Sequence, residues 1–136
     1  MSNAMTSIPK ELEAEHNQAV LAYLAGASAH GDVAQQMLEA CSRLGDCDHY
    51  CPDRQQFRYV AVYTRATIFG FATGIGTVAF RLDPTLKARA IETGAGEIPE
   101  LDEWVAFELF RSDWPSVDLK FWALKAYAQI REHQNA

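Results

Sequence analysis

Long apolar runs are missing from the sequence, and so is a segment that would direct the chain out of the cell. No uninterrupted apolar stretch approaches the roughly 20 residues that a membrane-spanning helix needs. Residues 6–15 have neither the basic start nor the apolar middle of a signal peptide. We therefore expect a cytoplasmic protein without a membrane partner.

Positive charge is also scarce. The net charge is −6, and residues 1–55 hold three basic side chains against eight acidic ones. Nucleic-acid binding draws most of its affinity from lysine and arginine side chains that face phosphates, so this balance argues against a nucleic-acid partner. A local basic patch is the alternative, although a solvated sheet face explains its residues about as well. Those residues are Arg58, Arg65, Arg81, Lys87 and Arg89.

Recognisable catalytic motifs are absent from the sequence. No serine stands in G-x-S-x-G, and no cysteine–histidine pair has the local context of a known enzyme family. Gly70, Gly74 and Gly76 match neither G-x-G-x-x-G nor the P-loop spacing, so hairpin turns explain them better. Glu13-x-x-His16 is half of a di-iron motif with no second copy. We assign no catalytic residue, and a role without catalysis is favoured.

The remaining composition is that of one folded domain. Apolar residues make up 49% of the chain and charged residues 22%, near the averages for globular proteins. No repeat, low-complexity tract or linker divides the chain. Met1–Ala4 reads as an expression remnant ahead of Met5, so we expect a single domain over residues 5–136.

The first third of the chain predicts a helix hairpin over residues 7–45. Apolar residues recur at helical spacing in two segments of this range, and the pattern is interrupted around residues 29–31. Asp32 is expected to cap the second helix, with Gln35 completing a capping box, and Gly45 to end it. The apolar stripe of that helix consists of Val33, Met37, Cys41 and Leu44.

The apolar pattern changes to a period of two after residue 57, which predicts an antiparallel sheet of about four strands. The strands are expected at residues 57–63, 67–71, 77–82 and 104–110. On the third strand, Val78, Phe80 and Leu82 share one face. Asp83-Pro84 predicts the start of a short helix after that strand.

A last helix is expected from Pro115 to about Glu132. With the four strands and the short helix it makes a sheet-and-helix unit over residues 57–133. The sequence therefore predicts an α+β fold, with the short helix and the C-terminal helix packed mainly on one face of the sheet.

Several segments of the second half carry a family resemblance. They are Val78-Ala79-Phe80-Arg81-Leu82-Asp83-Pro84, Ile98-Pro99-Glu100-Leu101, Trp104-Val105-Ala106-Phe107 and Ala126-Tyr127. In these segments residues 71–130 resemble the small bacterial YjbR-like and TfoX N-terminal-like domains. The resemblance implies a compact α+β fold, often without enzymatic activity, and a DNA-associated regulatory role. It supplies no catalytic residue. Arg81 stands where those families commonly have lysine, and the acidic N-terminal third has no counterpart in them.

Cysteine, histidine and aspartate side chains are concentrated between residues 41 and 53. The candidate metal ligands are Cys41, Cys47, His49, Cys51 and Asp53. Zinc takes four such donors, but their spacing departs from the C-x-x-C pattern, and Cys41 falls on the apolar stripe. We favour ordinary thiols with no cofactor, ahead of a zinc site and ahead of redox chemistry such as a Cys47–Cys51 disulfide.

Aromatic residues are concentrated between residues 104 and 127, and most of them are expected in the core. Phe110, Arg111 and Trp114 lie on the connection from the last strand to the last helix, where an exposed tryptophan beside an arginine is typical of an interface. The alternative is that Trp114 folds back against the last helix.

The function hypothesis that follows is a non-catalytic module that acts through protein–protein interaction. Its partner would be another protein or a second copy of the chain. A small metal- or thiol-dependent enzyme or sensor that uses Cys47, His49 and Cys51 is the first alternative. A DNA-associated regulator is the second, and it rests on the family resemblance only.

Overall fold

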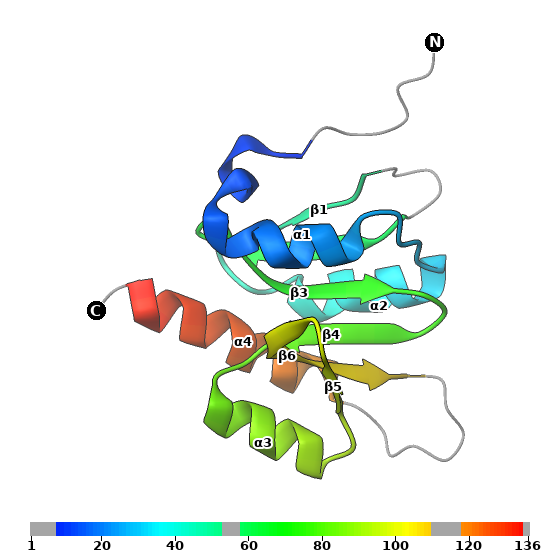
Figure 1. The fold of residues 1–136 in the computed structure, drawn as a ribbon, viewed down its shortest axis with the longest axis vertical. Coiled ribbons are helices and arrows are strands. Elements are labelled where there is room, and N and C mark those ends of the chain that lie inside the picture. The colour runs from blue at the N-terminus through cyan, green and yellow to red at the C-terminus, as the bar shows by residue number, and fades with distance from the viewer. Residues whose placement is uncertain (1–7, 53–57, 110–117, 135–136) are drawn as a thin grey trace.

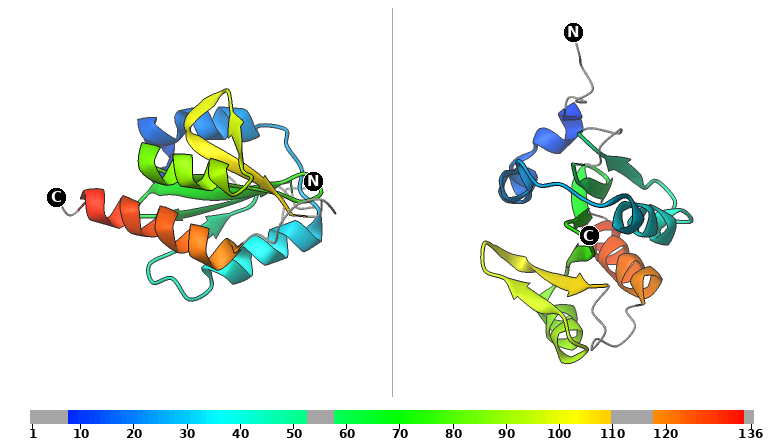
Figure 2. Two further views of the ribbon diagram at one scale, coloured as in Figure 1. Left: turned by 90° about the horizontal axis from the view of Figure 1, so that it is seen from below. Right: turned by 90° about the vertical axis from the view of Figure 1, so that its right-hand side faces the viewer.

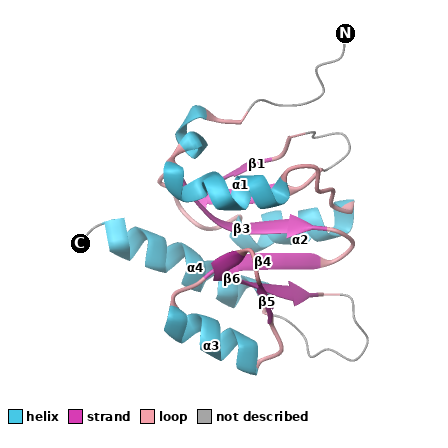
Figure 3. Ribbon diagram, in the orientation of Figure 1, coloured by secondary structure: helices cyan, strands magenta, loops and turns pink. Residues whose placement is uncertain are grey.

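The computed structural model describes residues 8–52, 58–109 and 118–134. It has an α+β fold with one six-stranded antiparallel sheet in the order β1-β2-β3-β4-β6-β5 (Figure 1, Figure 3). The strands are β1 (Asp48–Tyr50), β2 (Val60–Thr64), β3 (Thr67–Thr73), β4 (Thr77–Arg81), β5 (Gly96–Ile98) and β6 (Leu101–Glu108). The helices are α1 (Gln18–Leu24), α2 (Gly31–Cys41), α3 (Pro84–Glu92) and α4 (Leu119–Gln134). None of these helices has the length and apolarity needed to cross a membrane.

Two separate apolar cores lie on the two faces of the sheet. Val33 and Met37 of α2 share one core with Ala123 of α4, and Ala90 of α3 belongs to the same core. Val20 and Leu24 of α1 belong to the other core. Figure 2 shows the sheet edge-on in its right-hand view, with α1 on one side and α2 and α4 on the other.

The predicted helix hairpin over residues 7–45 is therefore wrong, whereas the short helix and the C-terminal helix contribute to one core on the same face, as predicted. An amphipathic pattern shows that each helix buries one side, but two helices can bury those sides against opposite faces of a sheet. The two helices here are separated by six residues that take the chain past the β3–β4 turn; within them, Ala29 forms a bridge with Gly74.

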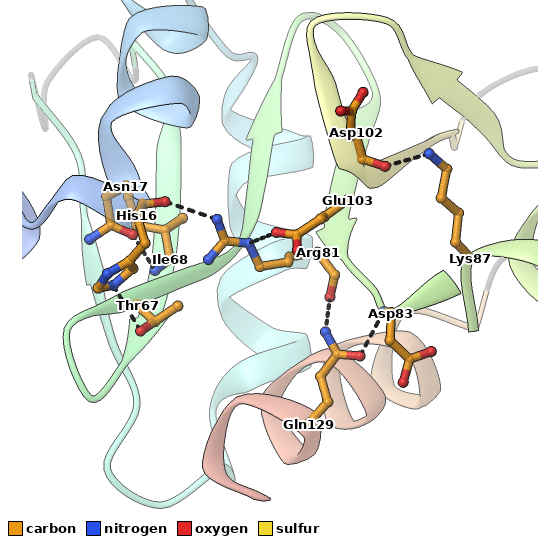
Figure 4. Close-up of polar contacts among 10 residues, drawn as sticks. All are labelled: His16, Asn17, Thr67, Ile68, Arg81, Asp83, Lys87, Asp102, Glu103 and Gln129. Carbon is orange, nitrogen blue, oxygen red and sulfur yellow. Dashed lines mark hydrogen bonds and ion pairs between the residues drawn. The ribbon is translucent and has the colours of Figure 1, made fainter. Parts of the chain in front are cut away.

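The start of the chain is also less regular than predicted. Two short 3₁₀ turns, Lys10–Glu13 and Glu15–Asn17, precede α1. Asn17 interrupts the apolar pattern and is fully buried. Its Nδ2 donates to the carbonyls of Leu12 at 3.2 Å and Ala66 at 2.9 Å, and its Oδ1 accepts from the Ile68 amide at 3.0 Å. These bonds join the N-terminal segment to the β2–β3 turn (Figure 4).

The β2–β3 turn needs this support. Arg65 and Ala66 have φ angles of 50° and 61°, a left-handed conformation that glycine and asparagine adopt far more readily. Besides Asn17, the Nε2 atom of His16 lies 3.0 Å from the Ala66 carbonyl and 3.0 Å from Thr67 Oγ1. His16 thus belongs to a turn-holding network, which agrees with the interpretation that Glu13-x-x-His16 is not a metal motif.

The middle of the sheet confirms the predicted pattern. Val78, Phe80 and Leu82 lie in the core beneath α2 and α4, and Ala79 lies in the opposite core. β3 departs from this alternation because a register shift opposite Val62 and Tyr63 places Phe69 as an extra residue in the strand. A Cβ atom at the neighbouring Gly70 would lie 3.1 Å from Val62 Cγ2, so the close packing at the bulge favours glycine.

Two strands were not predicted, and both lie at the edges of the sheet. No strand was predicted for the residues of β1 or for those of β5. Each has only three residues, too few to show an alternating pattern.

Helix starts were predicted with mixed success. Asp83 caps α3 as predicted, because its Oδ1 accepts from the Leu86 amide at 2.9 Å. Asp32 does not cap α2. The N-cap is His30, whose Nδ1 accepts from the Asp32 amide at 3.1 Å. That helix ends at Cys41 rather than at Gly45.

The last helix is joined to the sheet by a buried amide. Gln129 on α4 donates to the Arg81 carbonyl at 2.8 Å and accepts from the Asp83 amide at 2.9 Å (Figure 4). Arg81 is the last residue of β4 and Asp83 is the N-cap of α3, so the amide joins the end of the strand to the start of the helix. Gln129 therefore fixes the position of α4 against the end of β4.

Candidate functional site

A pocket of about 210 Å³ lies between the end of α2 and the β1 edge of the sheet. Its walls are formed by Leu38, Cys41, Ser42, Cys47, Asp48, His49 and Val62. Three of the five candidate metal ligands named above lie in this wall, so the structure brings Cys41, Cys47 and His49 together.

The secondary structure explains how the pocket residues meet. Cys41 is the last residue of α2, and the chain returns through a short turn to Cys47, the residue before β1. His49 pairs with Val62 across the β1–β2 ladder. Paired residues of an antiparallel sheet share a face, so His49 lies on the face that α2 covers.

Cys41 is buried, with 6% of its surface exposed, as its place on the apolar stripe of α2 predicted. Cys47 is half-buried, and it lies immediately before β1. None of the three cysteines is in a disulfide bond. Of the two thiols in the pocket wall, Cys47 is therefore the one that solvent can reach.

The thiols of Cys41 and Cys47 form an unequal pair. The Cys41 thiol donates a hydrogen bond to the Cys47 sulfur, which lowers the pKa of Cys47. The same hydrogen bond, followed by burial, raises the pKa of Cys41 far above the ordinary value. Cys47 is thus the group that ionises, and the Cys41 proton stabilises the thiolate. A thiolate is the nucleophilic form of cysteine.

Carboxylates next to Cys47 oppose this effect. Burial, Asp48 and Asp46 each act to raise the pKa of Cys47, but the hydrogen bond from Cys41 outweighs them. Asp46 is partly neutralised by Arg131 of α4, whose Nη1 lies 3.3 Å from its Oδ2. Asp48 has His49 as its neighbour, with Nδ1 3.9 Å from Oδ1.

The turn between the two cysteines is held by α4. The Tyr127 hydroxyl donates to the Gly45 carbonyl, and Arg131 Nη1 contacts both Asp46 and Thr64 Oγ1. The turn contains Asp46 at a φ of 57°, a left-handed conformation uncommon for residues other than glycine. Contacts from a distant helix thus determine how closely Cys47 approaches Cys41.

The five candidate ligands do not assemble into a metal site where the structure describes them. Within residues 8–52, 58–109 and 118–134, no three side chains of histidine, cysteine, aspartate or glutamate are placed around a common point for a metal ion. Cys51 is buried in the core beneath α2 and does not reach the pocket wall. Asp53 lies outside the described residues. Cys47 interacts with Cys41, which was not its partner in the Cys47–Cys51 disulfide considered as an alternative.

The predicted interface residues Phe110, Arg111 and Trp114 also lie outside the described residues. Among the other aromatic residues of this region, Trp104, Phe107 and Trp122 are buried, as predicted. Phe121 differs, because 40% of its surface is exposed on α4.

Sequence reasoning missed the two residues of α4 that hold the turn, Tyr127 and Arg131. Both are about eighty residues from the cysteines in the chain, and the only signal they carry is their spacing of one helical turn. That spacing shows that they share a face of a helix, but it does not show what the face contacts.

Comparison of the chain with family models, with curated proteins and with solved structures gave no match. The resemblance to YjbR-like and TfoX N-terminal-like domains therefore stays a prediction from the sequence.

Proposed function

We propose that this protein is a thiol-based redox sensor in which Cys47 reacts first and Cys41 completes a reversible disulfide. The observation that carries the proposal is that a buried thiol, Cys41, and a half-buried thiol, Cys47, meet in the wall of one pocket. Their interaction lowers the pKa of Cys47 and raises the pKa of Cys41. Sensor cysteines typically combine a lowered pKa, access to solvent and a second cysteine within reach.

The proposed reaction is a two-electron oxidation. The Cys47 thiolate attacks the oxidant, which is a peroxide or a small disulfide. A covalent bond forms on the Cys47 sulfur as the O–O or S–S bond of the oxidant breaks and hydroxide or a thiolate leaves. The Cys41 sulfur then attacks the Cys47 sulfur and expels the oxidant fragment, which leaves with the proton from Cys41. The sulfurs must approach to a bonded distance of about 2.05 Å. Rotation of the half-exposed Cys47 side chain brings them closer.

Treatment with one equivalent of hydrogen peroxide is expected to remove two of the three thiols and to link Cys41 to Cys47. Peptide mapping by mass spectrometry would identify the link, and dithiothreitol would reverse it. Cys47→Ala is expected to abolish the link, whereas Cys51→Ala should leave it intact, because Cys51 does not reach the pocket. A link through Cys51, or three thiols left unreacted in the folded protein, would contradict the proposal.

The hydrogen bond itself has a matched pair of variants. Cys41→Ala removes the donor and should move the pH midpoint of Cys47 alkylation upward, because the thiolate loses its stabilising proton. Cys41→Ser keeps a hydroxyl donor, so its midpoint should stay closer to that of the wild-type protein. Equal midpoints in all three proteins would show that Cys41 does not activate Cys47.

A protein-binding role is the second candidate, and the exposed apolar side chains of α4 favour it. Phe121 and Leu124 are 40% and 51% exposed and lie one helical turn apart. The Lys125 Nζ atom lies 5.5 Å from the centre of the Phe121 ring. An exposed aromatic residue beside a cation is a composition enriched at interfaces.

Self-association through this surface can be measured by sedimentation. If Phe121 and Leu124 pair two copies of the chain, Phe121→Ala should raise the dimer dissociation constant by about tenfold or more, as for a central aromatic interface residue. Ile75→Ala is the control, because it removes a more exposed apolar side chain, 76% exposed, from the β3–β4 turn. A wild-type chain that sediments as a monomer at high concentration would exclude the second copy as the partner.

A further inference from the structure

We infer that the oxidant that reacts with Cys47 is a small uncharged peroxide, and that the pocket discriminates against anionic disulfides. This inference rests on the proposed function and specifies its substrate class. It follows from the size of the pocket and from the charges that surround the Cys47 sulfur.

The size of the pocket limits what can reach the sulfur. Its volume of about 210 Å³ is shared by solvent and any reactant. Pockets for drug-sized ligands occupy about 300–1,000 Å³. A tripeptide disulfide could place only part of itself inside. Hydrogen peroxide, by contrast, is only slightly larger than a water molecule, whose share of liquid volume is about 30 Å³.

The charges around the sulfur are mainly negative. Asp46 and Asp48 flank Cys47 in the chain, and both are close enough to act electrostatically on its sulfur. Arg131 pairs with Asp46, whereas Asp48 meets the backbone amide of His49 at 2.8 Å and its imidazole at 3.9 Å but no arginine or lysine in the pocket wall. An approaching anion is repelled by this carboxylate and by the Cys47 thiolate, whereas a neutral molecule meets no such barrier.

The chemistry of a peroxide suits this pair. The Cys47 thiolate attacks one peroxide oxygen, the O–O bond breaks, and the departing hydroxide combines with the proton that Cys47 released to solvent on ionising, which forms water. Cys47 is then a sulfenic acid. The Cys41 sulfur attacks it, the S–O bond breaks, and the departing hydroxide combines with the Cys41 proton to form water. Two thiols and one peroxide thus give one disulfide and two waters.

The test compares three oxidants on the full-length wild-type protein: hydrogen peroxide, oxidised glutathione, which is anionic, and cystamine, which is a cationic disulfide. Each rate of Cys41–Cys47 disulfide formation is divided by the rate at which the same oxidant reacts with a cysteine whose amino and carboxyl groups, but not its thiol, are blocked. This division removes intrinsic differences in reactivity between the oxidants. Relative to oxidised glutathione, the normalised rates of peroxide and cystamine are expected to be higher by about tenfold, the size of effect that one or two nearby charges produce in water. Raising the salt from about 0.01 M to about 1 M should reduce both ratios, because the screening length falls from about 30 Å to about 3 Å.

Asp48→Asn is the decisive variant, because it removes the less compensated carboxylate with little change in shape. It should reduce the ratio of the normalised cystamine rate to the normalised glutathione rate by several-fold. Asp102→Asn, which changes a carboxylate outside the pocket wall, is the control and should change neither ratio. A normalised glutathione rate equal to that of peroxide or cystamine would overturn the inference and leave the dithiol sensor standing. Failure of all three oxidants to form the Cys41–Cys47 disulfide would instead overturn the proposed function.

Discussion

Asn17→Asp is expected to destabilise the fold by about 3 kcal/mol or more, the cost of burying a charge without a compensating cation. The side chain is fully buried and donates from Nδ2 to two carbonyls while it accepts from the Ile68 amide. A carboxylate keeps the accepted bond but places a negative oxygen against the carbonyls of Leu12 and Ala66. The loss should be measured as the change in free energy of unfolding in urea.

The loss should also depend on pH in a defined direction. Repulsion from the two carbonyls and burial both favour the neutral acid, so the introduced carboxyl group has a pKa in the folded variant above its unfolded value of about 3.9. The deficit is then largest above the folded pKa and shrinks as the pH falls toward the unfolded pKa. Gln18→Glu is the control, because Gln18 makes its bond to the Glu13 carbonyl at an exposed site. An equal loss in both variants would show that burial of Asn17 is not the cause.

Gly70→Val is expected to cost about 3 kcal/mol, and Gly70→Ala about half as much, because both overpack the bulge in β3. The first added atom of either side chain would lie 3.1 Å from Val62 Cγ2, 3.2 Å from Phe80 Cδ1 and 3.3 Å from the Ala79 carbonyl oxygen. All three neighbours belong to the middle of the sheet, where the backbone has little freedom to move.

Gly96→Ala is the matched control for the bulge. Gly96 is also in a strand, but a Cβ atom there would meet nothing within 4 Å. Its effect on the free energy of unfolding should lie within about 0.5 kcal/mol of zero, as for ordinary surface changes. If Gly70→Ala is equally mild, the bulge accommodates a side chain and the close approach does not explain the glycine.

The parts of the fold that follow from local chemistry were predictable from the sequence. The alternation of Val78, Phe80 and Leu82 predicted which side of β4 is buried beneath the helices, and Asp83-Pro84 predicted the start of α3. Both signals operate within a few residues. The assignment of α1 and α2 to opposite faces of the sheet could not be predicted in this way. The sequence pattern of each helix shows which side of the helix is apolar, but it does not show which face of the sheet that side packs against.

The sequence predicted which residues belong to the candidate site, but it did not predict which two cysteines interact. The stripe that contains Met37 predicted that Cys41 would be buried, and the spacing of Cys47, His49 and Cys51 suggested that they would lie close together. Which cysteine meets which depends on the turn that Tyr127 and Arg131 hold and on the strand that separates Cys47 from Cys51. Those contacts arise only when the two ends of the chain have packed.

The brevity of the outermost strands has a consequence for how this sheet behaves in concentrated solution. The two edge strands, β1 and β5, are only three residues long. Each carries exposed polar residues, Asp48 and His49 on β1 and Glu97 on β5. Long, flat, apolar edge strands are templates on which strands of other chains assemble into fibrils, and short edge strands with charged side chains suppress this assembly. The molecule is thereby protected against continuous cross-strand growth, so any partner is better received on its helical flanks than by lengthening the sheet.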